Sequence, residues 1–358
     1  MGPRTALVLL LPGLGDALAA GPILRGLRGE NWTLDAVTMH PPVSAYLRGL
    51  GIVRDVAQLP LRPTALDALR CVRGLRPRRY DAAILPFPAT RWQYALIARA
   101  VGARKLWMHE YGGAASAIAM TTRNLRVPLR GGHRLGENLR LARALGLPPD
   151  ANELQYWIPE SWRAARVPGT LGIHPGSMAW KGNEVKRWPY EHFAALALAE
   201  AARGRSVRFF LGPHEEREWE RAEQDFRGNT RISIVREPLV EAARLLAECE
   251  VFVGNDAGFS HLASGLGVKT LAIYGMTSEI RGAPIGPAVA YRPSLCPACH
   301  DEGLRGFECV RNIGYRCIVR DIEYDAVREK VDELFEAPPV EQQVALEGPY
   351  RLYGKAYA

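Results

Sequence analysis

The sequence predicts an α/β protein with two doubly wound domains, each a parallel sheet with helices on both faces. Apolar runs of strand length alternate with segments of helical periodicity through both halves of the chain. Turns that contain glycine or proline follow several of the apolar runs. The chain has 358 residues, which suits two domains of roughly 150–180 residues each better than a single one.

The first predicted domain covers residues 1–160. We expect strands at Thr5–Leu11, Thr33–Met39, Val53–Leu59, Asp81–Pro86 and Lys105–Met108. Helical spacing predicts helices at Asp16–Leu27, Ala65–Leu75 and Trp92–Val101. Proline and glycine residues between Ile158 and Gly169 indicate the domain boundary.

The second predicted domain covers residues 168–335 and repeats this alternation. We expect strands at Thr170–His174, Val207–Leu211, Ile232–Val235, Val251–Val253 and Thr270–Tyr274. The helices are predicted from Pro189 to about Arg203 and at Glu215–Phe226, Leu239–Ala247 and Phe259–Leu266. The polar tail, residues 336–358, either packs back on a domain or stays disordered.

The net charge of +8 and the pI of about 9.3 favour anionic partners. Nucleic acid is not expected among them, because the basic residues are not interleaved with aromatic ones. The apolar N-terminal run resembles a signal peptide, but Asp16 and the preceding glycines interrupt it. No run reaches the ~20 apolar residues of a membrane-spanning helix. We therefore expect a cytoplasmic protein, peripheral to the inner membrane if it contacts a membrane.

Asp16 follows the first predicted strand, in the sequence Pro12-Gly13-Leu14-Gly15-Asp16. Open α/β folds bind ligands at this carboxyl edge of the sheet. The segment is not a dinucleotide-binding motif, because Leu18 occupies the position of the third glycine. Two interpretations are open: Asp16 caps the following helix, or it is a general base that removes a proton from a hydroxyl group.

Three strand ends in the second half also carry polar residues. Ser177 follows His174-Pro175-Gly176, and Lys186 precedes a helix that starts near a proline. The sequence Gly254-Asn255-Asp256-Ala257-Gly258-Phe259-Ser260-His261 leads from a strand into a helix, and Thr277 follows the next strand. Helix N-termini, a lysine and hydroxyl groups suit a nucleotide diphosphate with an attached sugar. The alternatives are an exposed basic loop for Lys186 and an ordinary helix cap with a hydrogen-bonded core histidine for Asp256 and His261.

These motifs resemble glycosyltransferase family 9, the ADP-heptose:lipopolysaccharide heptosyltransferases. The resemblance covers about residues 5–335 and includes Gly15-Asp16, Lys186-Arg187-Trp188-Pro189, Asp256-Ala257-Gly258-Phe259-Ser260-His261-Leu262-Ala263 and Tyr274-Gly275-Met276-Thr277. It implies the GT-B fold, with an interdomain cleft, the acceptor on the N-terminal domain and the nucleotide sugar on the C-terminal one. Ala257 replaces the hydroxyl residue that is usual in the family.

The resemblance also implies roles for individual residues in an inverting, metal-independent transfer. Asp16 would be the catalytic base. The donor, with an ADP-sugar favoured, would be held by Ser177, Lys186, Glu215, Asp256, Gly258, His261 and Thr277. The acceptor would be a glycan or glycolipid such as lipopolysaccharide. Three other functions remain open: transfer from another nucleotide sugar, epimerisation of a sugar nucleotide, and nucleotide-sugar binding without catalysis.

Two further groups of residues have no assigned role in the transfer. Cys296, Cys299, Cys309 and Cys317 form a cluster in which the first pair has the spacing of a zinc half-site. The open interpretations are a structural zinc or iron–sulfur site, reduced structural thiols, and disulfides, which a reducing cytoplasm disfavours. The basic run from Arg70 to Arg79, including Arg76, Arg78 and Arg79, is either a solvated face or a patch for an anionic acceptor or membrane surface.

Overall fold

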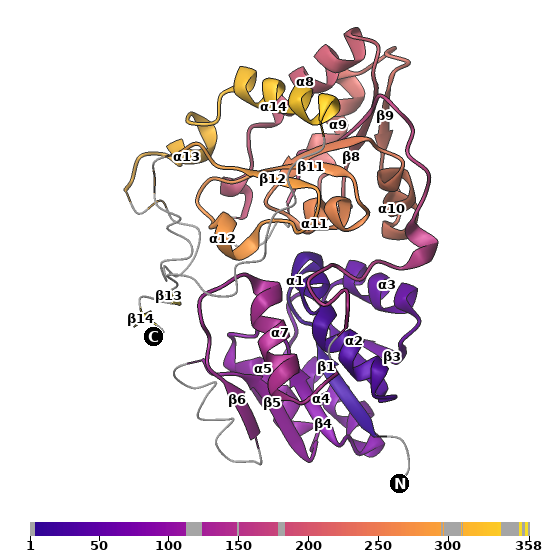
Figure 1. Cartoon of the computed structure of the whole chain (residues 1–358), viewed down its shortest axis with the longest axis vertical. Coiled ribbons are helices and arrows are strands. Elements are labelled where there is room, and N and C mark those ends of the chain that lie inside the picture. The colour runs from indigo at the N-terminus through magenta and orange to yellow at the C-terminus, as the bar shows by residue number, and fades with distance from the viewer. Residues whose placement is uncertain are drawn as a thin grey trace. The chain divides into compact units, whose positions relative to one another are not determined.

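The computed structural model describes residues 4–111, 124–148, 150–177, 183–294, 296, 309, 311–337, 351–352 and 355–356. The chain divides into two compact units between Pro159 and Glu160. Each unit contains one six-stranded sheet in which all strand pairs are parallel (Figure 1). The predicted α/β class is confirmed, and each unit is described separately below.

The first unit has the strand order β3-β2-β1-β4-β5-β6. Its strands are β1 (Thr5–Leu9), β2 (Thr33–Thr38), β3 (Val53–Gln58), β4 (Ala82–Leu85), β5 (Lys105–His109) and β6 (Asn124–Val127). Its helices are α1 (Leu14–Ala19), α2 (Gly21–Gly29), α3 (Pro41–Leu50), α4 (Ala65–Leu75), the short 3₁₀ turn η1 (Arg76–Arg78), α5 (Trp92–Ala100) and α7 (Arg134–Ala144).

Local sequence explains most of these elements. The residues of β1 and β4 are nearly all buried, as expected for central strands of a parallel sheet. Thr64 and Asp67 form a capping box that starts α4. The single helix predicted at Asp16–Leu27 is wrong: α1 ends at Ala19, and Gly21-Pro22 opens α2 because proline suits the first turn of a helix.

The second unit has the strand order β12-β11-β10-β7-β8-β9. Its strands are β7 (Thr170–His174), β8 (Ser206–Phe210), β9 (Ile232–Val235), β10 (Val251–Asn255), β11 (Lys269–Ile273) and β12 (Ala288–Tyr291). Its helices and turns are η2 (Glu160–Trp162), η3 (Asn183–Lys186), α8 (Tyr190–Ala202), α9 (Glu216–Asp225), α10 (Leu239–Ala247), α11 (Gly258–Gly265), α12 (Glu279–Gly282), α13 (Arg316–Val319) and α14 (Tyr324–Glu336). A separate antiparallel pair joins β13 (Arg351–Leu352) to β14 (Lys355–Ala356).

The core of the second unit lies between the sheet and helices α8, α9 and α14 (Figure 1). Trp188, just before α8, is fully buried there, and its indole N–H donates to the Ile322 carbonyl at 2.9 Å. Helices α10 and α11 contact each other, and α11 packs on β10 and β11. If the strands of this sheet are numbered from β7 as strand 1, their order is 3-2-1-4-5-6, the same as in the first sheet. Strands β7 and β10 therefore flank the point where the strand order reverses.

Candidate functional site

The predicted site residues of the second unit gather at the carboxyl ends of β7, β10 and β11. His174 of β7 lies beside Gly254 of β10 in the sheet register. The turns that follow these two strands therefore meet at the point where ligands bind in doubly wound folds. Thr277 follows β11, which pairs with β10 on its other side.

Asn255 connects the segments around this point. Its buried amide donates to the Pro175 carbonyl at 2.7 Å and accepts from the Trp188 backbone N–H at 2.8 Å. Its own carbonyl accepts from the Ser260 hydroxyl at 2.7 Å. The side chain thus fixes the β7 turn and the start of the α8 segment. The sequence motif contained Asn255 but did not indicate this role.

Lys186 and Asp256 form an ion pair, with Nζ 3.3 Å from Oδ2. Both side chains are largely buried, so the charges attract each other more strongly than they would in bulk water. The pair brings an ammonium group and a carboxylate to the first turn of α11. The N-cap of this helix is Ala257, which provides no side-chain cap. Backbone N–H groups at such a helix start favour an anion.

Arg187, to which the sequence interpretation gave no role, holds Ser177. The Arg187 Nε donates to the Ser177 hydroxyl at 3.1 Å, and a second guanidinium nitrogen donates to the Ser177 carbonyl. The same guanidinium forms an ion pair with Glu218 at 2.9 Å. Ser177 is therefore buried and positioned by a residue ten positions later in the chain.

Glu215 lies beneath the β7 turn and pairs with His174, whose Nε2 is 3.3 Å from Oε2. Burial raises the pKa of Glu215, but His174 and the Gly212 N–H, which donates at 2.7 Å, outweigh burial and lower the pKa below its usual value. At Gly176, a Cβ would lie 1.4 Å from the Glu215 Oε1. Only glycine allows this close approach of backbone and carboxylate.

Two buried polar atoms at this edge have no hydrogen-bond partner among the residues that the structure describes. They are the Thr277 hydroxyl and the His174 Nδ1. His261, on α11, is also buried. Buried polar groups are rarely left without partners, so this edge is suited to binding a polar ligand.

In the first unit, Asp16 lies beside Arg134, with Oδ1 2.9 Å from Nη1. Asp16 is the third residue of α1, and the N-cap position is Gly13, so the helix-cap interpretation of Asp16 is wrong. Buried Asn138 anchors α7 by hydrogen bonds to both Phe87 backbone groups and to the Ala19 carbonyl. The fold thereby places the start of α7 against α1.

His40, which follows β2, also faces Asp16. Burial lowers the pKa of His40, and the charge of Asp16 and the backbone of Leu11 only partly oppose this effect. The imidazole is therefore neutral near pH 7. Asp16 remains partly accessible to solvent, so its carboxylate can contact a substrate hydroxyl group.

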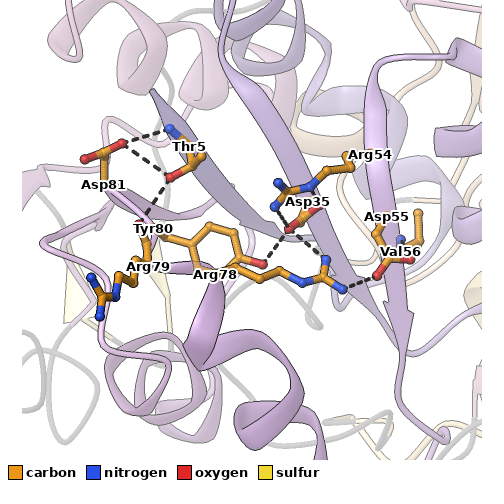
Figure 2. Close-up of polar contacts among 9 residues, drawn as sticks. All are labelled: Thr5, Asp35, Arg54, Asp55, Val56, Arg78, Arg79, Tyr80 and Asp81. Atoms are coloured by element: carbon orange, nitrogen blue, oxygen red, sulfur yellow. Dashed lines mark hydrogen bonds and ion pairs between the residues drawn. The ribbon is translucent and has the colours of Figure 1, made fainter. Parts of the chain in front are cut away.

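Arg78 of the predicted basic run forms ion pairs within the first unit. Arg78 donates to Asp35 at 2.8 Å and to Asp55 at 2.6 Å, and Asp35 is completely buried. Figure 2 shows Arg54 and Tyr80 converging on the same Asp35 carboxylate. Arg76 and Arg79 are exposed. All three arginines precede β4, so they lie at the amino end of the sheet, whereas Asp16 lies at the carboxyl end.

The predicted cysteine site is only partly described. Cys317 is buried against Met276, with Cys296 packed beside them, and Cys309 is half-buried. Backbone N–H groups of Tyr315, Ile313, Arg311 and Asn312 lower the pKa of the Cys309 thiol. Cys299 lies outside the described residues. No group of three or more metal-ligating side chains occurs within the described part of the chain, so the zinc site has no support from it.

No helix among the described residues is both long and apolar enough to span a bilayer.

Comparison with known proteins identifies the relatives of the chain. The family model "Glycosyltransferase family 9 (heptosyltransferase)" matches residues 68–294, more than half of the chain. Lipooligosaccharide heptosyltransferase 2 of Haemophilus influenzae is 27% identical over 168 residues, which are 46% of this chain and 46% of that protein. The chain thus spans about half the length of this curated relative. Lipopolysaccharide heptosyltransferase 3 of Escherichia coli is 24% identical over 75% of this chain and 83% of that protein.

Among solved structures, the E. coli ADP-heptose lps heptosyltransferase II aligns with a TM-score of 0.69. The alignment has 19% identity and covers 93% of this chain and 99% of that one. The two parallel six-stranded sheets therefore match the GT-B fold of the heptosyltransferases.

Proposed function

The chain belongs to glycosyltransferase family 9, the heptosyltransferase family, and from this premise we propose that it transfers a heptose from ADP-heptose to a hydroxyl group of a lipopolysaccharide-type acceptor. The observation that carries the proposal is the group of side chains at the carboxyl ends of β7 and β10. The solved relative named above is an ADP-heptose enzyme, which favours ADP as the nucleotide.

Lys186 and the uncapped start of α11 suit the diphosphate of the donor. Lys186 presents a positive charge and the start of α11 presents backbone N–H groups, and the two lie at the same point of the sheet edge. The Asp256 carboxylate accepts hydrogen bonds and suits sugar hydroxyl groups, and the Thr277 hydroxyl and His261 lie at the same edge. Glu215, held by His174 and Gly212, suits the two ribose hydroxyl groups. The second domain, residues 168–335, would thus bind the donor.

Asp16 of the first domain, residues 1–160, would act on the acceptor. Its carboxylate removes the proton of the acceptor hydroxyl while the hydroxyl oxygen attacks the anomeric carbon of the heptose. The bond from that carbon to the diphosphate breaks, and ADP leaves with the bonding electrons. Lys186 and the α11 N–H groups stabilise the charge that grows on the leaving group. One displacement inverts the anomeric configuration, and these side chains supply the chemistry without a metal.

A thermal-shift screen tests the donor class. Ligands that bind only the folded state raise the unfolding temperature according to their concentration relative to Kd. We expect ADP and ADP-sugars to stabilise the protein and GDP, UDP and dTDP to have little effect. The Lys186→Ala variant should lose most of this stabilisation. Equal shifts with all four nucleotides would contradict the assignment of an ADP-sugar donor.

A transfer assay tests the reaction. ADP-heptose and a lipopolysaccharide core acceptor that lacks heptose should give ADP and an acceptor heavier by one heptose. The Asp16→Asn variant should lower kcat by about 10²–10⁴-fold, the typical contribution of a general base, with ADP binding retained. Asp150→Asn, at a more exposed carboxylate of the same unit, is the control. Donor conversion without an acceptor would favour an epimerase, and ADP binding with no turnover would favour a non-catalytic binding protein.

A further inference from the structure

Helices α4 and α5 of the first unit expose an unusual number of large apolar side chains. Leu66 is 52% exposed, Leu69 44%, and Trp92 and Leu96 are each 45% exposed. They account for four of the ten exposed large hydrophobic residues in the described part of the chain. Single exposed apolar residues need no explanation, but a group on neighbouring elements marks an interaction surface.

The four side chains share one surface. Residues 66 and 69 lie on one face of α4, and residues 92 and 96 lie on one face of α5, because positions three and four apart are neighbours on a helix. The two helices contact each other. Their inner faces bury other residues, such as Leu75 of α4 and Ala95 of α5. The exposed side chains therefore point away from the unit's own core.

The sheet topology also determines which edge of the sheet lies nearer to these apolar side chains. In a parallel sheet each helix begins at the carboxyl end of the strand before it. Leu66 and Leu69 lie in the first half of α4, after β3, and Trp92 begins α5, after β4, with Leu96 at the midpoint of that helix. Three of these apolar side chains are thus on the half of their helix that is nearer to the carboxyl edge of the sheet, the edge that carries Asp16.

Basic residues border the apolar side chains. Exposed arginines on or next to the two helices include Arg62, Arg70, Arg73, Arg91 and Arg99. The one acidic residue in α4 or α5 is Asp67, which accepts hydrogen bonds from Thr64 at the start of its own helix. The surface therefore combines apolar side chains with positive charge and presents almost no negative charge. We call these nine residues, the four apolar ones and the five arginines, the α4–α5 surface.

We propose that the α4–α5 surface docks on an anionic lipid bilayer. Leucine and tryptophan side chains enter the boundary between headgroups and acyl chains, and tryptophan favours this boundary. Arginines beside them attract anionic headgroups. The inference rests on the proposed function in one respect. If the acceptor of the transfer is anchored in a bilayer, docking of the α4–α5 surface would bring that acceptor beside the sheet edge that carries Asp16.

Co-sedimentation of the full chain with vesicles tests the proposal. We expect binding to vesicles that contain phosphatidylglycerol, weaker binding to pure phosphatidylcholine, and a decrease with added salt. The apolar variant Leu66→Ser/Leu69→Ser/Trp92→Ser and the charge variant Arg70→Glu/Arg73→Glu should each bind anionic vesicles at least about tenfold more weakly. The replaced side chains are exposed, so both variants should keep the unfolding temperature of the wild type.

Matched controls lie in the second unit. Leu198, 39% exposed on α8, is the apolar control in the variant Leu198→Ser, and exposed Arg227 is the charge control in Arg227→Glu. Both controls should bind vesicles as the wild type does. Equal binding by wild type and both α4–α5 variants, or no wild-type binding to anionic vesicles, would overturn the proposal. Equal binding to neutral and anionic vesicles would reject the role of the arginines.

This test is independent of the transfer reaction, because vesicle binding needs neither donor nor acceptor. A chain that binds vesicles and transfers no sugar would reject the proposed function and retain the α4–α5 surface. If both proposals hold, the variants should transfer heptose to a water-soluble, deacylated acceptor at the wild-type rate. Their transfer to an acylated acceptor embedded in vesicles should be slower.

Discussion

Arg134 holds Asp16 by an ion pair in which Nη1 is 2.9 Å from Oδ1. The two residues are 118 positions apart in the sequence. The guanidinium fixes one carboxylate oxygen, and the proposed reaction assigns the acceptor proton to this carboxylate. This relationship makes Arg134 a positioning residue for the proposed base.

Replacement of Arg134 should therefore affect turnover more than donor binding. In Arg134→Met, we expect kcat to fall by about 10–100-fold, because a small misplacement of a catalytic group is costly, and the KM for the donor should stay unchanged. Arg134→Lys should recover part of the loss, since lysine can still pair with the carboxylate. Steady-state kinetics with both substrates varied provide the measurement. Arg143→Met, at an exposed position of α7, is the control, and an unchanged kcat in Arg134→Met would reject the positioning role.

Gly176 is predicted to be essential for donor binding. In Gly176→Ala, the new Cβ would lie 1.4 Å from the Glu215 Oε1, so the carboxylate must move away from His174 and Gly212. We expect the Kd for ADP, measured by calorimetry, to rise by about tenfold or more, as for the loss of a charge-assisted hydrogen bond. Gly74→Ala serves as the control, because nothing lies within 4 Å of that Cβ. Wild-type affinity in Gly176→Ala would show that Glu215 does not contact the nucleotide.

The Asp35 network is predicted to stabilise the first unit without contributing to catalysis. Asp35 is buried and bonded to Arg54, Arg78 and Tyr80, whereas Asp55, the other partner of Arg78, is 42% exposed (Figure 2). Asp35→Asn should lower the free energy of unfolding by about 3 kcal/mol. Asp55→Asn should lower it by less than about 1 kcal/mol, as is typical of exposed ion pairs. Urea unfolding measures both values, and kcat should stay unchanged in both variants.

The contribution of Asp35 should also depend on pH. Burial raises its pKa, but the hydrogen bonds from Arg54, Tyr80 and Arg78 outweigh burial, so the folded-state pKa is lower than usual. A carboxyl group whose pKa is lower in the folded state than in the unfolded state stabilises the fold at pH values above its unfolded pKa of about 3.9. This stabilisation is lost as the pH falls from that value toward the folded-state pKa. The difference between wild type and Asp35→Asn should therefore shrink below about pH 4. A constant difference there would contradict this explanation.

His109 gives a second sensitivity to acid, at higher pH than Asp35. Burial and, to a smaller extent, the charge of Arg140 lower its pKa to about 3, and the hydrogen bond to Val127 only partly opposes them. Below the unfolded pKa of about 6.5 the unfolded chain binds a proton that the folded chain does not bind, so stability falls as pH decreases from 6.5 toward 3. Between pH 6.5 and pH 5, the wild type should lose about 2 kcal/mol more than His109→Gln. Parallel urea-unfolding profiles for the two proteins would refute the prediction.

Local sequence patterns predicted much of the secondary structure. The strand at Thr170–His174 and the helix at Ala65–Leu75 have the predicted bounds, because a buried strand and an amphipathic helix are visible in a short window of sequence. Helices α3 and α7 were not predicted. The first begins with two prolines, and the second has a polar face around buried Glu137 and Asn138. Tertiary contacts of these residues, rather than their hydrophobic periodicity, stabilise such segments.

The sequence by itself determined the α/β class, the alternation of strands and helices, the strand-end positions of Asp16, Asp256 and Thr277, and the place of Lys186 shortly before a helix. The strands and helices could be predicted because each depends mainly on residues that are close together in the sequence. The positions at strand ends could be predicted because the carboxyl ends of parallel strands lie at one edge of a sheet. Only the tertiary structure decided which charges meet. It paired Arg134 with Asp16, Arg78 with Asp35, and His174 with Glu215. Such partners are tens of residues apart, and their distance depends on strand order and helix packing, which no local pattern encodes.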